Sequence, residues 1–451
     1  MLWTPGSWRQ RQALQQPNYP DQTAVDRALA ELRQLPPLVT SWEVLQLRAQ
    51  LAEAADGKRF VLQGGDCAER FADCTPRRIA NMLKVLVQMS LVLVVGGGRP
   101  VIRIGRFAGQ YAKPRSSDTE TRNGVELPCY RGDIVNSPEF TREARTPNPE
   151  LLLRGYERSA LTLNFIRALV KGGFADLHHP EYFDLDWVRD SPHRLEYHRM
   201  VETIGESLRF MENVLGVRAG ESDRIEFFTS HEALHLGYEE AQTRTVPRRP
   251  GYFNLAAHLP WIGLRTNHPD GAHVEFMRGI ENPIAIKVDA KASREAIARW
   301  FELLDPDRTP GRLTFIHRLG VKGIAEGLPK LIETVRAEGG RVLWICDAMH
   351  GNTRTTPSGI KTRHFEDIYS EVEQAFDIHR RMGSHLGGVH IELTGENVTE
   401  CIGGARGTAE EDLGRAYESQ VDPRLNYEQS IELAFMIARK MKLDVAQAAS
   451  S

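Results

Sequence analysis

The stretch PIAIKVDAKASREAIARWFELLDPDRTPGRLTFIHRLGVKGIAEGLPKLIETVRAEGGRVLWIC, residues 283–346, alternates short apolar runs with longer segments of helical period. Its runs PIAIK (283–287), RLTFIH (312–317) and RVLWIC (341–346) have the length and composition of buried strands. Between them, residues 293–304 and 322–338 carry apolar side chains at helical spacing, with Ser293 as a candidate N-cap. This order predicts parallel strands joined by crossover helices.

The same rhythm extends along most of the chain. Residues 362–382 form a further helix candidate, which ends at Gly383. The other strand candidates are RFVLQ (59–63), VIRIG (101–105), IEFFT (225–229), FNLAA (253–257) and VHIEL (389–393). Eight strands in a βαβα order predict an α/β fold, a (β/α)8 TIM barrel, because right-handed parallel crossovers can close the sheet and remove its edges.

The rhythm is irregular in two places. The third and fourth strands are too close for an ordinary crossover helix, so one of their boundaries is expected to be misplaced. The second and third strands are separated by more than a normal loop, which predicts a helical insertion at 135–222 within a barrel at 58–445. Its helix candidates lie at 149–171 and 192–215. Residues 1–57 form an N-terminal extension, with helix candidates at 26–32 and 41–55, that could pack across the barrel floor or onto another subunit.

Composition narrows the classes of function. The chain has 451 residues, of which 41% are hydrophobic and 26% charged, and its formal net charge is -3. It has no excess of basic residues that would indicate binding to nucleic acid. The N-terminus lacks a signal-peptide core, and no window approaches the length of about 18 apolar residues expected of a membrane span. We therefore expect a cytoplasmic protein without a membrane segment. Its five cysteines are odd in number and widely spread, which predicts reduced thiols rather than a disulfide framework.

Cationic side chains follow several of the predicted strands. In parallel barrels the C-terminal strand ends meet at one face, so these side chains would converge there. Guanidinium forks and an ammonium suit phosphate oxygens, and the set is large enough for two phosphate groups. Any one of them alone is more typical of a solvated or ion-paired rim residue. The set comprises Arg106, Arg115, Arg265, Lys287 and Arg318.

A second group, Cys67, His350, Glu392 and Asp422, has the mixed sulfur, nitrogen and oxygen donors of a transition-metal site. Such donors suit Mn, Co, Fe or Zn better than Mg or Ca. Each member has an alternative: Cys67 as a small buried hydrophobe, His350 as a turn residue, and Asp422 as the start of a helix at 424–441. Glu392 is harder to explain otherwise, because a carboxylate within an apolar strand needs a partner.

Ten motifs in order along the chain resemble those of the type II (plant-like) 3-deoxy-D-arabino-heptulosonate 7-phosphate synthases. They are QQPNYPD (15–21), LQGGDCAERF (62–71), GRFAGQYAKPRS (105–116), YRGD (130–133), TSHEALHLGYE (229–239), DGAHVEF (270–276), DPDRTPGRLT (305–314), CDAMHGNT (346–353), HIELTGENVTEC (390–401) and DPRLN (422–426). The resemblance implies the barrel and the condensation of phosphoenolpyruvate with erythrose 4-phosphate and water, which releases phosphate at the first step of the shikimate pathway.

The resemblance also implies roles for single residues. It makes Cys67, His350, Glu392 and Asp422 the ligands of one divalent ion, with Mn or Co expected first and Fe or Zn as alternatives. It places phosphoenolpyruvate on Arg106, Arg265, Lys287 and Arg318, and the erythrose phosphate on Arg115 and Ser116. Lys113 falls beside the reacting carbons, where it could donate a proton to the developing alkoxide or neutralise substrate charge.

Two residues depart from the family pattern, and other functions are considered beside the one that the family implies. Leu264 stands where relatives usually have Glu, and Val421 stands where some have Cys, which excludes a redox bridge from there to Cys67. The relatives also imply a homo-oligomer (dimer or tetramer), a chorismate mutase partner and an aromatic amino acid effector. The insertion is expected to form either a subunit interface or the effector site, and the alternative is that it serves only as structural padding. The rival functions are a synthase for another aldehyde and an inactive barrel that serves as a sensor or partner.

Overall fold

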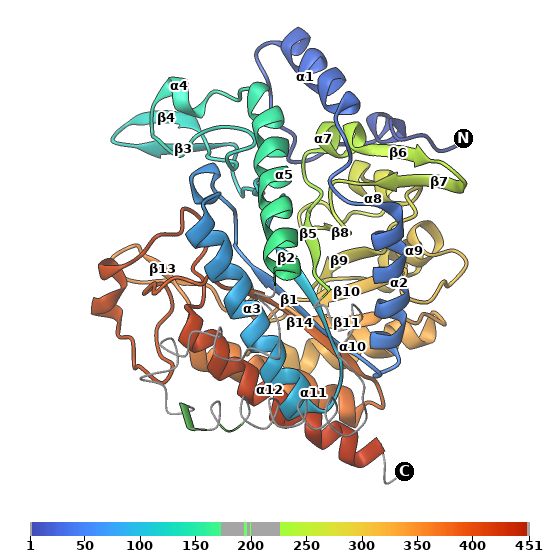
Figure 1. The fold of residues 1–451 in the computed structure, drawn as a ribbon, viewed down its shortest axis with the longest axis vertical. Helices are drawn as coiled ribbons and strands as arrows, with labels where there is room; N and C mark the ends of the chain where they lie inside the picture. Colours follow the sequence, from blue (N-terminus) through green and yellow to red (C-terminus); the bar gives the residue numbers. More distant parts are fainter. Residues whose placement is uncertain (1, 173–193, 196–198, 200–225, 449–451) are drawn as a thin grey trace.

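The described residues form a closed barrel of eight parallel strands (Figure 1). The structure is a computed structural model that describes residues 2–172, 194–195, 199 and 226–448. Around the barrel the order is β1-β14-β11-β10-β9-β8-β5-β2, so first and last strands are neighbours. The predicted TIM barrel is confirmed. Its strands are β1 (Phe60–Gly65), β2 (Val101–Arg106), β5 (Phe228–Glu232), β8 (Leu259–Ile262), β9 (Ile284–Val288), β10 (Leu313–His317), β11 (Leu343–Cys346) and β14 (Leu386–Glu392).

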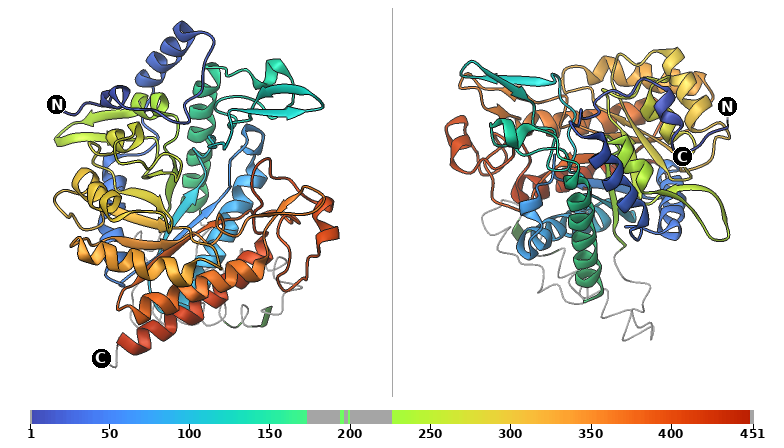
Figure 2. Two further views of the ribbon diagram at one scale, coloured as in Figure 1. Left: turned by 180° about the vertical axis from the view of Figure 1, so that it is seen from behind. Right: turned by 90° about the horizontal axis from the view of Figure 1, so that it is seen from above.

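Helices cover the outside of the barrel, and consecutive ones lie side by side at the back (Figure 2). The helix predictions at 293–304, 322–338 and 362–382 are confirmed as α9, α10 and α11. Ser293 caps α9, since its Oγ accepts a hydrogen bond from Ala296 N at 3.2 Å. The helices are α3 (Pro76–Gly97), α5 (Glu150–Lys171), α7 (Leu236–Ala241), α8 (Ala272–Met277), α9 (Arg294–Leu304), α10 (Ile324–Ala337), α11 (Phe365–Arg381) and α12 (Tyr427–Ala448).

The N-terminal extension supplies the barrel floor. Helix α2 (Ser41–Ala55) begins at a capping box, in which Thr40 and Glu43 bond each other's backbone N–H groups. Its side chains Leu47 and Leu51 are fully buried and join the inward-facing residues at the N-terminal ends of the strands in one apolar cluster. Of the two placements considered for this extension, α2 adopts the one across the floor. Helix α1 (Gln22–Gln34) instead contacts α5 and α7 on the outside.

The long connection from β2 to β5 contains the hairpin β3 (Thr119–Arg122) and β4 (Val125–Pro128), the short helix α4 (Arg142–Arg145) and α5. Helix α5 confirms the helix expected at 149–171 and packs against α1 and α3. The helix expected at 192–215 lies outside the described residues except for a few positions. The boundaries 135–222 of a separate insertion therefore stay a prediction.

The fourth strand was wrongly predicted at 253–257. Phe253 and Asn254 end β7 (Arg249–Asn254), which pairs with β6 (Thr243–Val246) in an antiparallel hairpin outside the barrel. The barrel strand is β8, whose sequence LPWI is only four residues long and contains Pro260. A proline in a short run is a poor strand signal, whereas the run 253–257, which begins in β7 and is buried throughout, has the composition of a strand. The remaining short elements are β12 (Arg354–Thr355), β13 (Lys361–Thr362), η1 (Ser7–Gln10), η2 (Phe71–Asp73) and η6 (Glu410–Arg415).

Helix α3 corrects the expectation that no segment could match a membrane span. Among the described residues, this is the one helix whose length and apolar composition would be sufficient to cross a membrane. Most of its apolar side chains are buried, including Leu83, Leu86 and Leu93, and it lies against α12 and α5. Its composition is therefore explained by packing between the barrel and two neighbouring helices.

The floor helix generates a stability prediction. Leu51→Ala removes a fully buried side chain from the inner cluster and is expected to lower the free energy of unfolding by about 2–5 kcal/mol. Urea denaturation followed by circular dichroism measures this change. Leu161→Ala is the control, because Leu161 is 55% exposed and should cost under about 0.5 kcal/mol. Equal effects of the two substitutions would contradict the role of α2 as a buried plug.

Candidate active site

The predicted metal ligands converge at the C-terminal mouth of the barrel. Cys67 follows β1, Glu392 ends β14, and Asp422 lies in the loop before α12. Their ligand atoms, one sulfur and two carboxylate oxygens, all lie within 4.8 Å of one another. His350 follows β11 and places its Nε2 at 3.1 Å from Glu392 Oε1. The closed barrel thus brings together Cys67 and Asp422, which are 355 residues apart in the chain.

Strand register explains why these groups lie level with one another. Gly65 is paired with Glu392 on one side and with Arg106 on the other. Gly65 has a φ of 144°, and a Cβ there would lie 2.8 Å from the carbonyl oxygen of Arg106. Only glycine tolerates that approach. The turn that delivers Cys67 to the site therefore depends on Gly65.

His350 is oriented by a neighbouring carboxylate. Its Nδ1 lies 2.8 Å from Asp347 Oδ2, which places the proton on Nδ1 and leaves Nε2 free to accept. Burial lowers the pKa of His350, which favours the neutral imidazole that a metal requires. Asp347 also accepts a hydrogen bond of 2.7 Å from Lys287 Nζ. One buried carboxylate therefore positions both a predicted metal ligand and a predicted phosphate-binding side chain.

The charge of Glu392 is compensated from several sides. Its side chain is fully buried, which alone would raise its pKa. His350 in its protonated form, Lys113, Arg363 and Arg106 instead hold the pKa of this carboxyl well below its ordinary value. Glu392 is therefore ionised and available as an oxygen donor.

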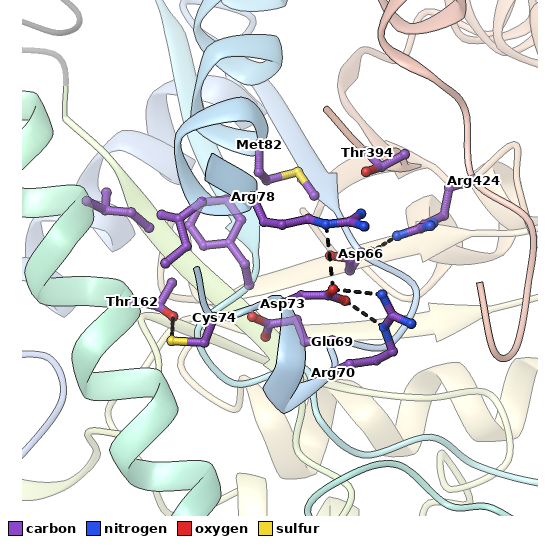
Figure 3. Close-up of a pocket in the computed structure, with 13 residues that line it drawn as sticks. Asp66, Glu69, Arg70, Asp73, Cys74, Arg78, Met82, Thr162, Thr394 and Arg424 are labelled. Carbon is purple, nitrogen blue, oxygen red and sulfur yellow. Dashed lines mark hydrogen bonds and ion pairs between the residues drawn. The ribbon is translucent and has the colours of Figure 1, made fainter. Parts of the chain in front are cut away.

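Two buried arginines tie the ligand-bearing loops together. Arg363 forms an ion pair of 2.8 Å with Glu392 Oε2 and donates a hydrogen bond to the carbonyl of Pro423, directly after Asp422. Arg424 forms an ion pair of 2.5 Å with Asp66, directly before Cys67 (Figure 3). These clamps connect the segments of Cys67, Glu392 and Asp422. Arg363 was not predicted from the sequence, because this residue lies in the loop between β13 and α11, where no periodic pattern marks it.

A cleft opens beside the ligand cluster, with an empty volume of about 1080 Å³. Arg265 Nη2 donates to Ser116 Oγ at 2.8 Å across it. The cleft thus brings most of the predicted substrate-binding side chains together with two predicted metal ligands. Among its lining residues are Lys113, Arg115, Ser116, Leu264, Arg265, Lys287, Arg318, His350 and Asp422.

Arg106 lies beneath the cleft rather than in its lining. Its guanidinium contacts Glu392 Oε1 at 3.1 Å, the carbonyl of Cys67 at 3.2 Å and His390 Nε2 at 2.6 Å. His390 Nδ1 in turn donates to Gln63 Oε1 at 2.8 Å. In this arrangement Arg106 supports the ligand cluster, and its predicted contact with phosphoenolpyruvate stays a prediction.

The family model described as the class-II DAHP synthetase family matches residues 3–438. The chain belongs to that family. It is 48% identical over 432 residues to a phospho-2-dehydro-3-deoxyheptonate aldolase of Streptomyces coelicolor, an alignment that covers 96% of each chain. It is 46% identical over 452 residues to a protein of the same name from Neurospora crassa, covering 97% of this chain and 94% of the relative.

The fold also has a solved counterpart. A phospho-2-dehydro-3-deoxyheptonate aldolase from Francisella tularensis matches with a TM-score of 0.51 at 13% identity, covering 94% of this chain and 99% of that one. At this level of identity the likeness concerns the barrel fold alone.

The four side chains suit a divalent transition metal. They offer a thiol sulfur, an imidazole nitrogen with its second nitrogen already fixed by Asp347, and two carboxylates. Burial and the nearby Glu392 raise the pKa of the Cys67 thiol to about 12, although Lys113 and Arg106 oppose this. A bound cation would favour the thiolate and compensate the two carboxylates.

Asp347→Asn tests the support of His350. The amide keeps the size of the side chain but removes the charge that orients the imidazole, so divalent metal affinity should fall by about 10–100-fold. Isothermal titration of the chelator-treated protein with Mn²⁺ or Co²⁺ measures it. Asp367→Asn is the control. Asp367 lies on α11 and is paired with Arg354, so this substitution makes the same charge change away from the site and should leave the metal affinity unchanged. Unaltered affinity in Asp347→Asn would disprove the support.

Proposed function

We propose that this protein condenses phosphoenolpyruvate with D-erythrose 4-phosphate and water to give 3-deoxy-D-arabino-heptulosonate 7-phosphate and phosphate, using one divalent metal ion. One observation carries the proposal. A cleft rich in cationic side chains opens directly onto the cluster of Cys67, His350, Glu392 and Asp422. Two phosphorylated substrates and a polarised carbonyl require this combination. Membership of the DAHP synthetase family supports the same reaction.

Cys67, His350, Glu392 and Asp422 would hold the ion, for which Mn²⁺ or Co²⁺ is proposed before Fe²⁺ or Zn²⁺. When bound, it supplies Lewis-acid polarisation of an aldehyde oxygen.

The cationic side chains of the cleft bind and orient the two substrates. Lys287, Arg265 and Arg318 provide positive charge for the phosphate and carboxylate of phosphoenolpyruvate, with Arg106 supporting the site from below. Arg115 and Ser116 lie where a second phosphate can bind. Held in this way, C3 of phosphoenolpyruvate can form a bond to the aldehyde carbon of erythrose 4-phosphate. Water then adds at C2, and phosphate leaves by cleavage of the bond between C2 and oxygen.

Lys113 acts first as a fixed positive charge. Its Nζ lies 2.6 Å from Cys67 Sγ and 2.8 Å from Asp422 Oδ2. Burial would lower its pKa, but Asp422, Cys67 and Glu392 raise it above the ordinary value. The ammonium is therefore charged at neutral pH and neutralises charge beside the reacting carbons. The same ammonium can donate a proton to an alkoxide, because an alkoxide is a far stronger base than the amine.

Further proposals rest on the family rather than on this chain's geometry. They are a cytoplasmic homo-oligomer, dimer or tetramer, an aromatic amino acid effector, and a chorismate mutase partner. Leu264 lies in the lining of the cleft, so it can alter substrate affinity directly. Inhibition assays with Trp, Tyr and Phe, alone and together, test the effector.

A coupled assay that follows loss of phosphoenolpyruvate tests the reaction. Turnover should need erythrose 4-phosphate, disappear after chelation and return with single divalent metals. Cys67→Ala should abolish metal-dependent turnover, whereas Cys74→Ala, whose thiol contacts Thr162 behind the site, should retain it. Turnover with another aldehyde but not with erythrose 4-phosphate would refute the assigned substrate. Full activity in Cys67→Ala would refute the metal site.

Arg265 offers a test of phosphate binding. Arg265→Ala removes a guanidinium from the cleft wall, and a lost charged hydrogen bond of about 1.5–3 kcal/mol lowers kcat/KM by roughly 10–150-fold. Steady-state kinetics with each substrate varied in turn show which substrate is affected. Arg299→Ala is the control, because Arg299 forms an exposed pair with Glu302 on α9. A kcat/KM equal to that of the unsubstituted protein would exclude Arg265 from substrate binding.

A further inference from the structure

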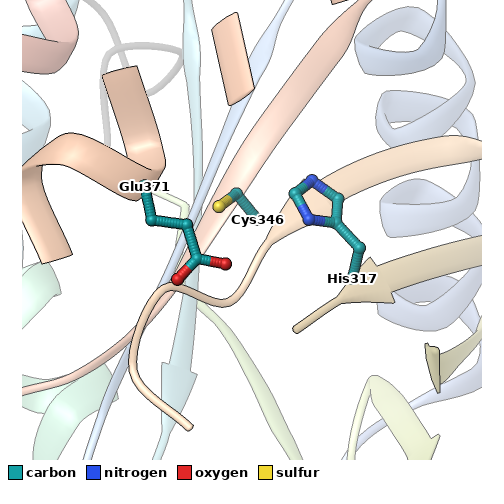
Figure 4. Close-up of side chains that lie close together, drawn as sticks. All are labelled: His317, Cys346 and Glu371. Atoms are coloured by element: carbon teal, nitrogen blue, oxygen red, sulfur yellow. The ribbon is translucent and has the colours of Figure 1, made fainter. Parts of the chain in front are cut away.

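A second group of potential metal ligands lies outside the barrel wall, behind the proposed catalytic cluster. It consists of His317 at the end of β10, Cys346 at the end of β11 and Glu371 on α11 (Figure 4). One ligand atom from each lies within 4.8 Å of the others, and all three side chains have 0% exposure. Nothing in the proposed reaction uses these residues.

The buried imidazole of His317 lacks hydrogen-bond partners in the described part of the chain. Neither of its ring nitrogens has a hydrogen-bond partner, although both are buried. Burial lowers its pKa to about 4, so the imidazole is neutral and carries one N–H donor and one acceptor. An unpaired buried polar atom costs about 1–3 kcal/mol. A ligand bound to this ring would relieve that cost in part.

The buried carboxylate of Glu371 has hydrogen-bond donors but no cationic partner among the described residues. Its carboxylate accepts hydrogen bonds from Leu319 N at 3.3 Å, Gly320 N at 2.9 Å and Asn352 Nδ2 at 2.6 Å. Donors on three sides suit an ionised carboxylate, yet within the described ranges no cationic side chain forms an ion pair with it. Burial accordingly raises its pKa to about 8. An ionised carboxylate offers about four lone-pair sites, so one on Oε2 remains for a cation.

We propose that His317, Cys346 and Glu371 form a second site for a transition-metal ion such as Zn²⁺ or Co²⁺. A neutral imidazole, a thiolate and a carboxylate are typical ligands of these ions and poor ones for Mg²⁺ or Ca²⁺. The charge balance also favours metal binding at this site, because a divalent cation with two anionic ligands and one neutral ligand leaves no net charge in the buried site.

A further histidine, His379, lies beside His317 but outside the group of three ligands. Its ring centroid is 6.0 Å from that of His317, and its Nε2 is buried without a hydrogen-bond partner. Its Nδ1 lies 3.0 Å from Ser384 Oγ, which fixes the ring in the way that outer hydrogen bonds orient metal-bound histidines.

A metal ion bound by these three residues would have a structural role. Side chains alternate across a strand, so His317 and Cys346 point outward while the next residues, Arg318 and Asp347, belong to the catalytic face. Glu371 already holds the backbone that follows Arg318. A metal at the second site would join β10, β11 and α11 directly behind the loops that carry the proposed substrate-binding and metal-orienting groups.

Cobalt separates the two sites in the full-length protein, because a cobalt–thiolate bond produces a near-ultraviolet charge-transfer band. Chelator-treated Cys67→Ser protein, which lacks the thiolate of the first site, is titrated with Co²⁺. The band should still appear, with one tightly bound cobalt associated with it. It should vanish in Cys67→Ser/Cys346→Ser and persist in Cys67→Ser/Cys401→Ser, because Cys401 is equally buried but outside the group. A Cys67→Ser protein without the band overturns the proposal.

Native mass spectrometry of the unsubstituted protein gives a test that does not depend on the folding of the variants. Two cobalt ions per chain are expected after titration, falling to one in His317→Phe, and one ion in the unsubstituted protein overturns the second site. Turnover is measured separately. Two bound ions without turnover of phosphoenolpyruvate and erythrose 4-phosphate would refute the proposed reaction and leave the second site standing.

Discussion

The burial of the Glu392 carboxylate is the constraint on which the rest of the site depends. An ionised carboxylate removed from water costs several kcal/mol unless charged groups and hydrogen bonds replace its solvation. Here the compensation comes from Arg106 on β2, Lys113 after it and Arg363 before α11. Because these groups lie on separate elements, the charge balance holds only when the barrel is closed in this register. A protein that folds correctly therefore assembles the ligand cluster at the same time.

The closed barrel divides the two tasks of stability and chemistry between its ends. At the N-terminal end, Leu47 and Leu51 of α2 complete an apolar cluster with inward-facing strand residues. At the other end the inward positions become polar, from Gln63 and His390 up to Arg106 and Glu392. The apolar floor supports the barrel without any of the charged groups, which leaves the mouth free to concentrate cations and carboxylates that would destabilise an ordinary core.

Much of this architecture could be predicted from the sequence, because parallel strands buried on both faces have apolar runs and helices have their own period. The failures have physical causes. β8 is too short and contains Pro260, so the buried run that begins in the hairpin strand β7 gave the stronger signal. The converging donors could be proposed because strand ends meet in a barrel, but Asp422 needed the family resemblance. The role of Arg363 and the contacts of Arg106 with Cys67 and Glu392 depend on tertiary structure that no local pattern encodes.

The alternation of side chains across β10 and β11 places two donor groups back to back. Asp347, on the inner side, orients His350 and pairs with Lys287, whereas Cys346, one residue earlier, faces Glu371 on α11. Glu371 and Asn352 are in turn hydrogen-bonded to each other across the loops that follow the two strands. Strain at the outer group is therefore transmitted towards Asp347 and Arg318, because the interior is close-packed. The position of the proposed catalytic groups thus depends on how the outer polar group is satisfied as well as on the mouth of the barrel.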